Sequence, residues 1–214
     1  MTMPSARLQT GREEIATAIT HGLGAAFAAA GLVALVVVTS LAGDPWRIVA
    51  TSIYGASAVA LFAASTVYHW LEAPRAKRVF QVLDHAAIFL LIAGTYTPFS
   101  LVTLRGPWGW SLFGVVWGIA VLGVCFESLW LGKFPRLSMA LYLVMGWVGV
   151  VAAVPIWRAL PISGLGWLAS GGLAYTAGVV FFVWERLPFH HTLWHLCVLL
   201  GAACHFAAVW VAVA

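Results

Sequence analysis

Apolar residues run through this chain in long continuous stretches, separated by short polar segments. A helix needs roughly 20 residues to cross a hydrocarbon core. Stretches of about that length cover residues 15–41, 46–70, 79–104, 108–131, 137–157, 162–184 and 191–213. Because the stretches are continuous rather than alternating, they predict membrane-spanning α-helices, which satisfy their own backbone polar groups, and not the strands of a barrel.

The segments between the stretches carry proline, glycine or charge and predict short loops. They read GDP at 43–45, LEAPRAKR at 71–78, RGP at 105–107, GKFPR at 132–136 and ERLPFH at 185–190. The first stretch is too long for a signal peptide and is expected to be a retained helix. We therefore expect one all-α domain of seven transmembrane helices over residues 1–214, with a short segment 1–13 before the first helix.

Composition supports a membrane protein over a soluble one. Of 214 residues, 63% are hydrophobic and 8% are charged, and the mean hydropathy is +0.97. These values lie outside the usual range of soluble domains. Cys125, Cys197 and Cys204 all fall inside apolar stretches without CxxC spacing, so we expect small packing residues and not a disulfide or thiolate metal site.

The basic residues predict the orientation of the chain. With alternating loops, eight of the eleven lie on the amino-terminal side, which the positive-inside rule places in the cytoplasm. The carboxyl terminus is then outside. Anionic lipid head groups account for the basic excess, and no nucleic-acid partner is implied. The eight are Arg7, Arg12, Arg75, Lys77, Arg78, Lys133, Arg136 and Arg186, against Arg47, Arg105 and Arg158 on the other side.

With this orientation, most of the polar residues within the predicted helices lie in the cytoplasmic half of the membrane. His69 ends the second stretch, Asp84 and His85 begin the third, and His191 and His195 begin the seventh. Ionisable residues within membrane segments are by default candidates for function.

The motif HTLWH at 191–195 places two imidazoles on one helix face, which suits a shared metal ion. Alone it is equally consistent with a hydrogen-bonded pair at the membrane interface. STVYH at 65–69 adds His69 at the same expected depth, with Ser65 one turn earlier. Three imidazoles and one water are the usual ligands of catalytic Zn²⁺, which lowers the pKa of that water to about 7 and polarises a carbonyl. Iron, copper and nickel also accept imidazole.

Asp84 has two interpretations. It could act as a general base or orient the water, or it could be an acid favoured at a helix start by the macrodipole. His85 and His190 are expected to be interfacial or supporting residues.

Two histidines stand further from the expected metal site. His21 could hydrogen-bond a carboxylate or substrate, or pack against Gly22 and Gly24. His205 lies about 15 Å beyond His195 along a helix and is expected to be a packing residue. Pro98 predicts a kink late in the third helix.

Several motifs together resemble the bacterial hemolysin III family. That family belongs with the progestin and adiponectin receptors and more distantly resembles the alkaline ceramidases. The motifs are EEIATAITHGLG at 13–24, STVYH at 65–69, LDHAAIFLLIAGTYTPF at 83–99, LYLVMGW at 141–147 and HTLWHLCVLLGAACHF at 191–206.

The resemblance implies a protein of the bacterial plasma (inner) membrane with a zinc site near its cytoplasmic side. Its metal ligands correspond to His69, His191 and His195, the aspartate near the zinc-site water to Asp84, and the serine of the SxxxH element to Ser65. Thr17 stands where the family usually has asparagine. The short segment before the first helix does not match the larger cytoplasmic region of adiponectin receptors, so hormone signalling is not implied.

Three functions are compatible with such a protein, and experiments can distinguish them. The leading one is a zinc-dependent hydrolase of lipid amide or ester bonds, with membrane lipids as partners, Asp84 accepting a proton and Ser65 stabilising the oxyanion. The second is a zinc-stabilised lipid sensor without turnover. The third, a haemolytic pore, fits poorly because a pore needs polar residues along its full length.

Overall fold

The computed structural model describes residues 10–213, and every regular element within that range is helical. Seven helical segments are long and apolar enough to cross a membrane, which confirms the predicted fold class. The elements are α1 (Gly11–Ala42), α2 (Pro45–Trp70), α3 (Pro74–Pro98), η1 (Phe99–Thr103), α4 (Pro107–Trp130), α5 (Pro135–Trp147), η2 (Val148–Ala152), α6 (Ala153–Ala159), α7 (Ile162–Val183) and α8 (His190–Val213).

Two of the seven spans change helix type within the membrane. Span three continues from α3 through the π-helix η1, directly after Pro98. Proline lacks an N–H and disturbs the α-helical ladder, which explains the change of helix type directly after Pro98; the kink expected there is still a prediction. Span five consists of α5, the 3-10 helix η2 and α6, an interruption that the apolar pattern did not predict.

Local sequence explains where the helices begin. Proline is the first residue of α2, α3, α4 and α5, a position that suits its fixed φ and missing N–H. Asp44 accepts a hydrogen bond from Trp46 N at 2.9 Å and caps α2. Thr10 and Glu13 form a capping box at the start of α1. Gly43, Gly106 and Gly132 adopt positive φ in the connections, which glycine tolerates without strain.

The predicted boundaries were wrong where charged residues lie inside a helix. The segments 71–78 and 132–136 were expected to be loops, but α3 begins at Pro74 and α5 at Pro135. The first helix begins at Gly11, so part of the expected leading segment 1–13 is helical. Hydropathy finds the part of a helix in the hydrocarbon and overlooks its charged first turns.

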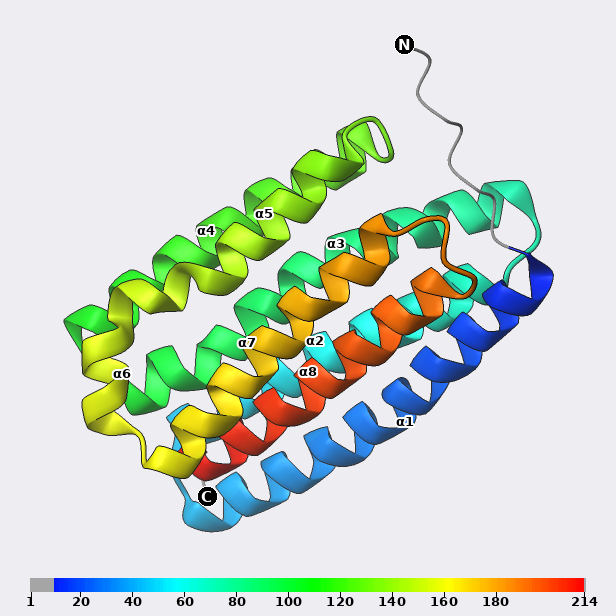
Figure 1. Ribbon diagram of the computed structural model, residues 1–214. Coiled ribbons are helices and arrows are strands. Elements are labelled where there is room, and N and C mark those ends of the chain that lie inside the picture. The colour runs from blue at the N-terminus through cyan, green and yellow to red at the C-terminus, as the bar shows by residue number, and fades with distance from the viewer. Residues whose placement is uncertain (1–9, 214) are drawn as a thin grey trace.

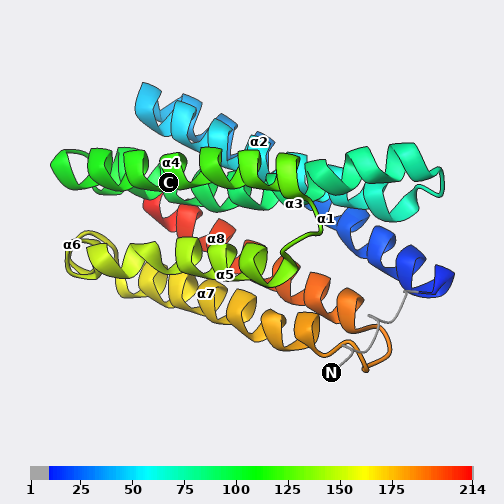
Figure 2. The same cartoon turned by 90° about the horizontal axis from the view of Figure 1, so that it is seen from above.

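The helices form a bundle in which α5 is the loosely packed member. α1 packs extensively on α2, α2 on α3, and α7 on α8, whereas α5 touches α3, α4 and α7 only lightly. Figure 1 shows α4 and α5 along one edge of the bundle, and Figure 2 shows α5 beside α7. This loose packing leaves space inside the bundle next to α5.

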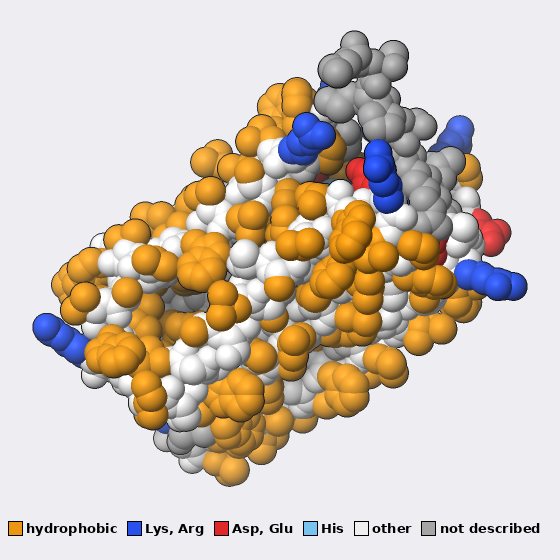
Figure 3. All heavy atoms as spheres, viewed as in Figure 1, with side chains coloured by type: hydrophobic (Ala, Val, Ile, Leu, Met, Phe, Trp, Pro, Cys, Tyr) orange, Lys and Arg blue, Asp and Glu red, His pale blue; other side chains and the backbone are white. Residues whose placement is uncertain are grey.

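Basic residues gather at one end of the bundle, here called the basic end. Figure 3 shows most of the visible Lys and Arg side chains toward the end of the bundle where α1 begins, while apolar side chains are spread over much of the rest of this face. The starts of α1, α3, α5 and α8 and the ends of α2, α4 and α7 lie at the basic end. Arg7, one of the eight residues that predict the orientation, lies outside the described residues. That the basic end faces the cytoplasm is still a prediction.

Candidate metal centre and adjoining cavity

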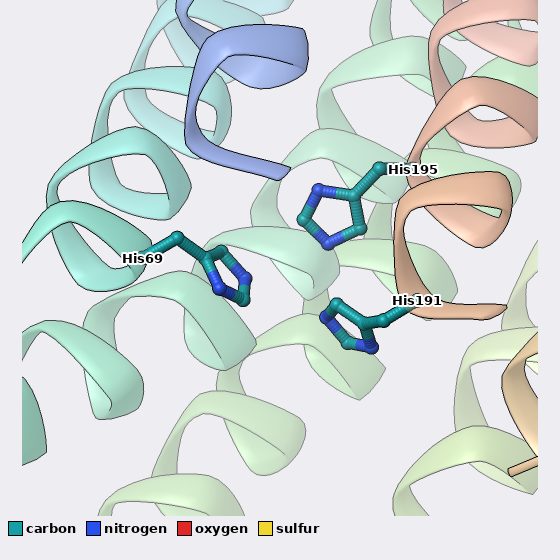
Figure 4. Close-up of side chains that lie close together, drawn as sticks. All are labelled: His69, His191 and His195. Atoms are coloured by element: carbon teal, nitrogen blue, oxygen red, sulfur yellow. The ribbon is translucent and has the colours of Figure 1, made fainter. Parts of the chain in front are cut away.

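Three histidines from two helices converge near the basic end. His69 lies in the last turn of α2, and His191 and His195 lie in the first turns of α8. One ring nitrogen from each lies within 4.8 Å of those of the other two. Figure 4 shows the rings turned toward a common space between the helices. The predicted shared depth of the three residues is therefore confirmed.

The three imidazoles fit a metal ion by their chemistry as well as their spacing. Nε2 of His69 and Nδ1 of His195 are buried and have no hydrogen-bond partner among the described residues. A buried nitrogen left without a partner is costly and calls for an explanation such as an ion. Three imidazole nitrogens suit Zn²⁺ and leave room for a further ligand. The residues present thus fit the zinc site that the family resemblance implies.

Glu14 orients one of the three rings. Its Oε2 lies 2.7 Å from His69 Nδ1, and its Oε1 accepts a hydrogen bond from Lys77 Nζ at 3.0 Å. A carboxylate can only accept, so Nδ1 of His69 carries the proton and Nε2 is left as the free nitrogen. A carboxylate behind a histidine ligand is a common device for fixing its tautomer and orientation.

The sequence analysis did not predict this contact of Glu14. A signal was present: Glu14, Thr17 and His21 are spaced by three and four residues and so share one face of α1. The structure shows that this face of α1 packs toward the histidine cluster. Thr17 is fully buried, and its Oγ1 lies 2.9 Å from Oγ1 of Thr192 on α8.

His21 stacks on the cluster. Its ring centroid lies 3.7 Å from that of His195, with 22° between the rings, and its other neighbour is the edge of Phe62 at 5.0 Å. Both His21 nitrogens are buried without a hydrogen-bond partner among the described residues. The sequence suggested that His21 either forms a hydrogen bond to a carboxylate or substrate, or packs against Gly22 and Gly24. The observed contacts are packing contacts, although with aromatic rings.

Asp84 and Ser65 lie at the same end of the bundle. Asp84 is 7% exposed and lies within electrostatic reach of His69 and His85. Ser65 is fully buried, and its hydroxyl lies beside the Asp84 carboxylate. The structure brings both residues to the cluster, as the sequence led us to expect; their catalytic roles are still predictions.

The other polar residues flagged in the sequence fall into supporting positions. Nδ1 of His190 lies 3.2 Å from Phe181 O, and Nε2 of His205 lies 3.2 Å from Leu168 O. His205 also contacts the Tyr175 ring, so its expected packing role is confirmed. Of the three free cysteines, Cys204 is buried, as expected of a packing residue, whereas Cys197 is partly buried and Cys125 is exposed on the surface of the bundle, so the expectation was wrong for Cys125.

A cavity of about 480 Å³ extends from the histidine cluster along the bundle. Along the third span its lining runs from Asp84 on α3 to Phe99, the first residue of η1, which is about 22 Å along a helix. On α8 it runs from His191 to His205, and the remaining walls are mainly apolar residues of α5, α6 and α7. The loosely packed α5 forms one side. The shape suits a long apolar chain whose polar end meets the histidines.

Fold and site together define a polytopic membrane protein of seven helices with a buried three-histidine cluster at one end of an apolar cavity. The chain belongs to the family described as "Haemolysin-III related", whose sequence profile matches residues 9–206. It is a multi-pass protein of the bacterial cell membrane.

Individual relatives support this membership. The chain is similar to "Hemolysin-3" of Bacillus cereus, at 44% identity over 198 residues, which cover 92% of this chain and 90% of the relative. The "Hemolysin-3 homolog" of Bacillus subtilis (strain 168) is 40% identical over 92% of this chain and 93% of its own length. The human "Monocyte to macrophage differentiation factor" is 32% identical over 79% of this chain and 73% of its own length.

These comparisons confirm the resemblance to the hemolysin III family and to the wider group of progestin and adiponectin receptors.

Proposed function

We propose that this protein is a zinc-dependent hydrolase of lipid amide or ester bonds whose site lies within the bundle near the basic end. The observation that carries the proposal is the position of the histidine cluster. It lies, together with Asp84, at one end of a cavity that is long, apolar and shaped for a hydrocarbon chain. An apolar pocket with a few convergent polar groups is the usual form of a site for such a ligand.

Each polar residue at this end has a chemical part to perform. His69, His191 and His195 would hold the ion, which supplies a Lewis acid that polarises a carbonyl and makes water more acidic. Asp84 accepts the proton of the attacking water and returns it to the departing amine or alcohol, because its carboxylate lies on the cavity wall within electrostatic reach of His69. The buried hydroxyl of Ser65, beside Asp84, donates to the oxygen on which negative charge develops. The apolar walls exclude bulk water.

The activity is tested by incubating the purified protein with ceramides and other acyl lipids and measuring released fatty acid. We expect release that a chelator abolishes and added Zn²⁺ restores. Asp84→Asn should lower the rate by about 100-fold or more, as loss of a general base does. Absence of metal-dependent release across a broad panel would contradict the proposal.

The metal site is tested separately by metal analysis. His69→Ala and His191→Ala should each lose most of the bound zinc, while His205→Asn, a histidine outside the cluster, should keep it. Full zinc occupancy in either alanine variant rules out the shared site.

A second candidate function is lipid sensing without turnover. The observation that favours it is that α2 and α8 meet only sparsely, and the three histidines bridge them. A metal ion there would stabilise the bundle in its own right. In this case a chelator lowers the melting temperature of the protein although no lipid is hydrolysed at any metal concentration.

Pore formation has less support than either candidate, although a relative is named Hemolysin-3. The cavity is polar mainly at the basic end, and its walls along α5, α6 and α7 are mostly apolar. A water-filled pore needs polar groups over its whole length. Single-channel currents from the purified protein in pure lipid bilayers would reverse this judgement.

A further inference from the structure

A second polar cluster lies beside the cavity on helices that hold no histidine of the metal centre. It consists of His85 on α3, Glu127 on α4, and Ser138 and Tyr142 on α5, and is here called the α3–α5 cluster. His85, Ser138 and Tyr142 line the cavity, whereas Glu127 is 1% exposed and lies behind them. His85 and Tyr142 fall within the family motifs at 83–99 and 141–147, but the proposed metal chemistry uses none of the four residues.

Glu127 is a buried carboxylate that faces three donors, His85, Ser138 and Tyr142. Its Oε2 lies 3.5 Å from His85 Nδ1, and its Oε1 accepts from the Tyr142 hydroxyl at 3.4 Å. Both separations exceed the usual length of a charge-assisted hydrogen bond, which is about 2.7–2.9 Å. The Tyr142 hydroxyl is closer to the backbone oxygen of His85, at 3.1 Å. A carboxylate held this loosely within a membrane bundle is expensive and by default a functional candidate.

The charges around the cavity indicate which kind of head group the α3–α5 cluster can bind. Among the described residues, no Lys or Arg side chain lines the cavity, while Asp84 lies on its wall and Glu127 directly behind it. Lys77, the cation near the metal centre, is paired with Glu14 on α1. Away from the metal centre, an anionic head such as a phosphate would meet like charge and find no Lys or Arg, whereas an amine or hydroxyl would find acceptors.

We propose that the α3–α5 cluster is the subsite for the polar head of the lipid whose chain lies in the cavity, and that it selects a hydrogen-bond-donating, non-anionic head. His85 and Tyr142 contact the head, and Glu127 behind them orients His85 and supplies the negative charge. The proposal rests on the proposed function only in placing a lipid in the cavity, because head-group binding requires no hydrolysis.

The test compares three ligands that share one saturated long chain: the primary amine, the alcohol and the phosphate monoester. Binding is measured by native mass spectrometry from a neutral detergent. The His191→Ala background removes a metal ligand, so binding is read without turnover. The amine should bind at least about tenfold more tightly than the phosphate, the size of effect that unfavourable charge placement produces.

Glu127→Gln keeps the size of the side chain and removes its charge. We expect it to weaken amine binding about fivefold or more while leaving the phosphate unchanged or bound more tightly. Glu72→Gln, which alters an exposed acid outside the cavity, is the matched control and should change neither ligand. Tyr142→Phe should weaken both amine and alcohol by about two- to tenfold, the range for one hydrogen bond.

Specific results overturn the proposal. If Glu127→Gln changes all three ligands equally, or none of them, the α3–α5 cluster only ties three helices together. If that variant does not fold, His85→Gln replaces it and must reduce the preference for the amine. A protein that shows the preference but hydrolyses no lipid contradicts the proposed hydrolase alone.

Discussion

His69 has one hydrogen-bonded ring nitrogen and one buried nitrogen without a partner among the described residues, and this distinguishes it from an ordinary buried histidine. One nitrogen faces Glu14 at 2.7 Å, and the other is buried without a protein partner. The carboxylate is itself fixed by Lys77, so three helices determine one imidazole orientation. At this scale, the metal centre depends on residues that are not ligands.

Replacing Glu14 by Gln should therefore weaken zinc binding without removing a ligand. The amide keeps the size of the side chain but loses the charged acceptor that orients His69. We expect a loss of affinity of about 10- to 100-fold, measured by competition with a chelator of known zinc affinity. Glu185→Gln, which changes an exposed acid in the loop before α8, is the control. Equal affinities for the two variants would show that Glu14 does not support the site.

Helices α7 and α8 approach closely because of glycine. The buried residues of α7 are Gly164, Gly171 and Gly178, spaced by seven residues. A Cβ at Gly178 would lie 2.8 Å from Cys197 Cβ. Membrane helices associate through such small residues, because lipid gives little hydrophobic drive for helix contact. This contact places the start of α8, and with it His191 and His195.

Gly178→Val should separate the two helices and destabilise the protein by about 1–3 kcal/mol, the usual cost of overpacking. Gly166→Val is the matched control, because a Cβ at Gly166 has open space around it. Melting temperatures in detergent measure the difference. If the two variants melt together, glycine packing does not set the α7–α8 contact.

The break within the fifth span is held by one tyrosine of α3. The Tyr96 hydroxyl donates to Gly146 O at 2.7 Å and accepts from Gly149 N at 2.8 Å. It thereby satisfies backbone groups where α5 gives way to η2, which in lipid would otherwise lack partners.

Tyr96→Phe removes these bonds and keeps the ring. We expect a loss of about 1–3 kcal/mol and faster amide hydrogen exchange in Val148–Ala152 than in α8. Unchanged exchange in that segment would contradict a role for Tyr96 in holding the break.

The whole molecule is asymmetric along its axis, with basic residues, histidines and most acids toward one end. This asymmetry predicts an orientation in the membrane, with the basic end in the cytoplasm. It also places the proposed hydrolytic site near the inner leaflet.

Cysteine labelling tests this orientation in a background whose three native cysteines are replaced. Arg158→Cys lies near the end opposite the basic end, and Lys133→Cys lies at the basic end. A membrane-impermeant maleimide added to intact cells should label Arg158→Cys, and Lys133→Cys only after lysis. The reverse pattern would place the histidine cluster in the outer leaflet.

Much of the candidate site could be predicted from the sequence, because the depth of a residue in the membrane follows from the number of residues between it and the nearest charged loop. A charged loop marks one surface, and each following residue lies a fixed rise further in, so His69, Asp84, His191 and His195 could be aligned without coordinates. Depth does not reveal which face of a helix meets which neighbour. For this reason the Glu14 contact with His69 and the pairing of His85 with Glu127 were missed.

The seven spans, the charge asymmetry and the level of the histidines were determined by the sequence itself, since hydropathy, length and charge are properties of continuous segments. The tertiary structure decided how the helices rotate against one another. That rotation turned the unpaired histidine nitrogens toward a common space, buried Glu127 behind His85, and left the cavity beside α5. These features depend on packing between distant segments, which no local pattern encodes.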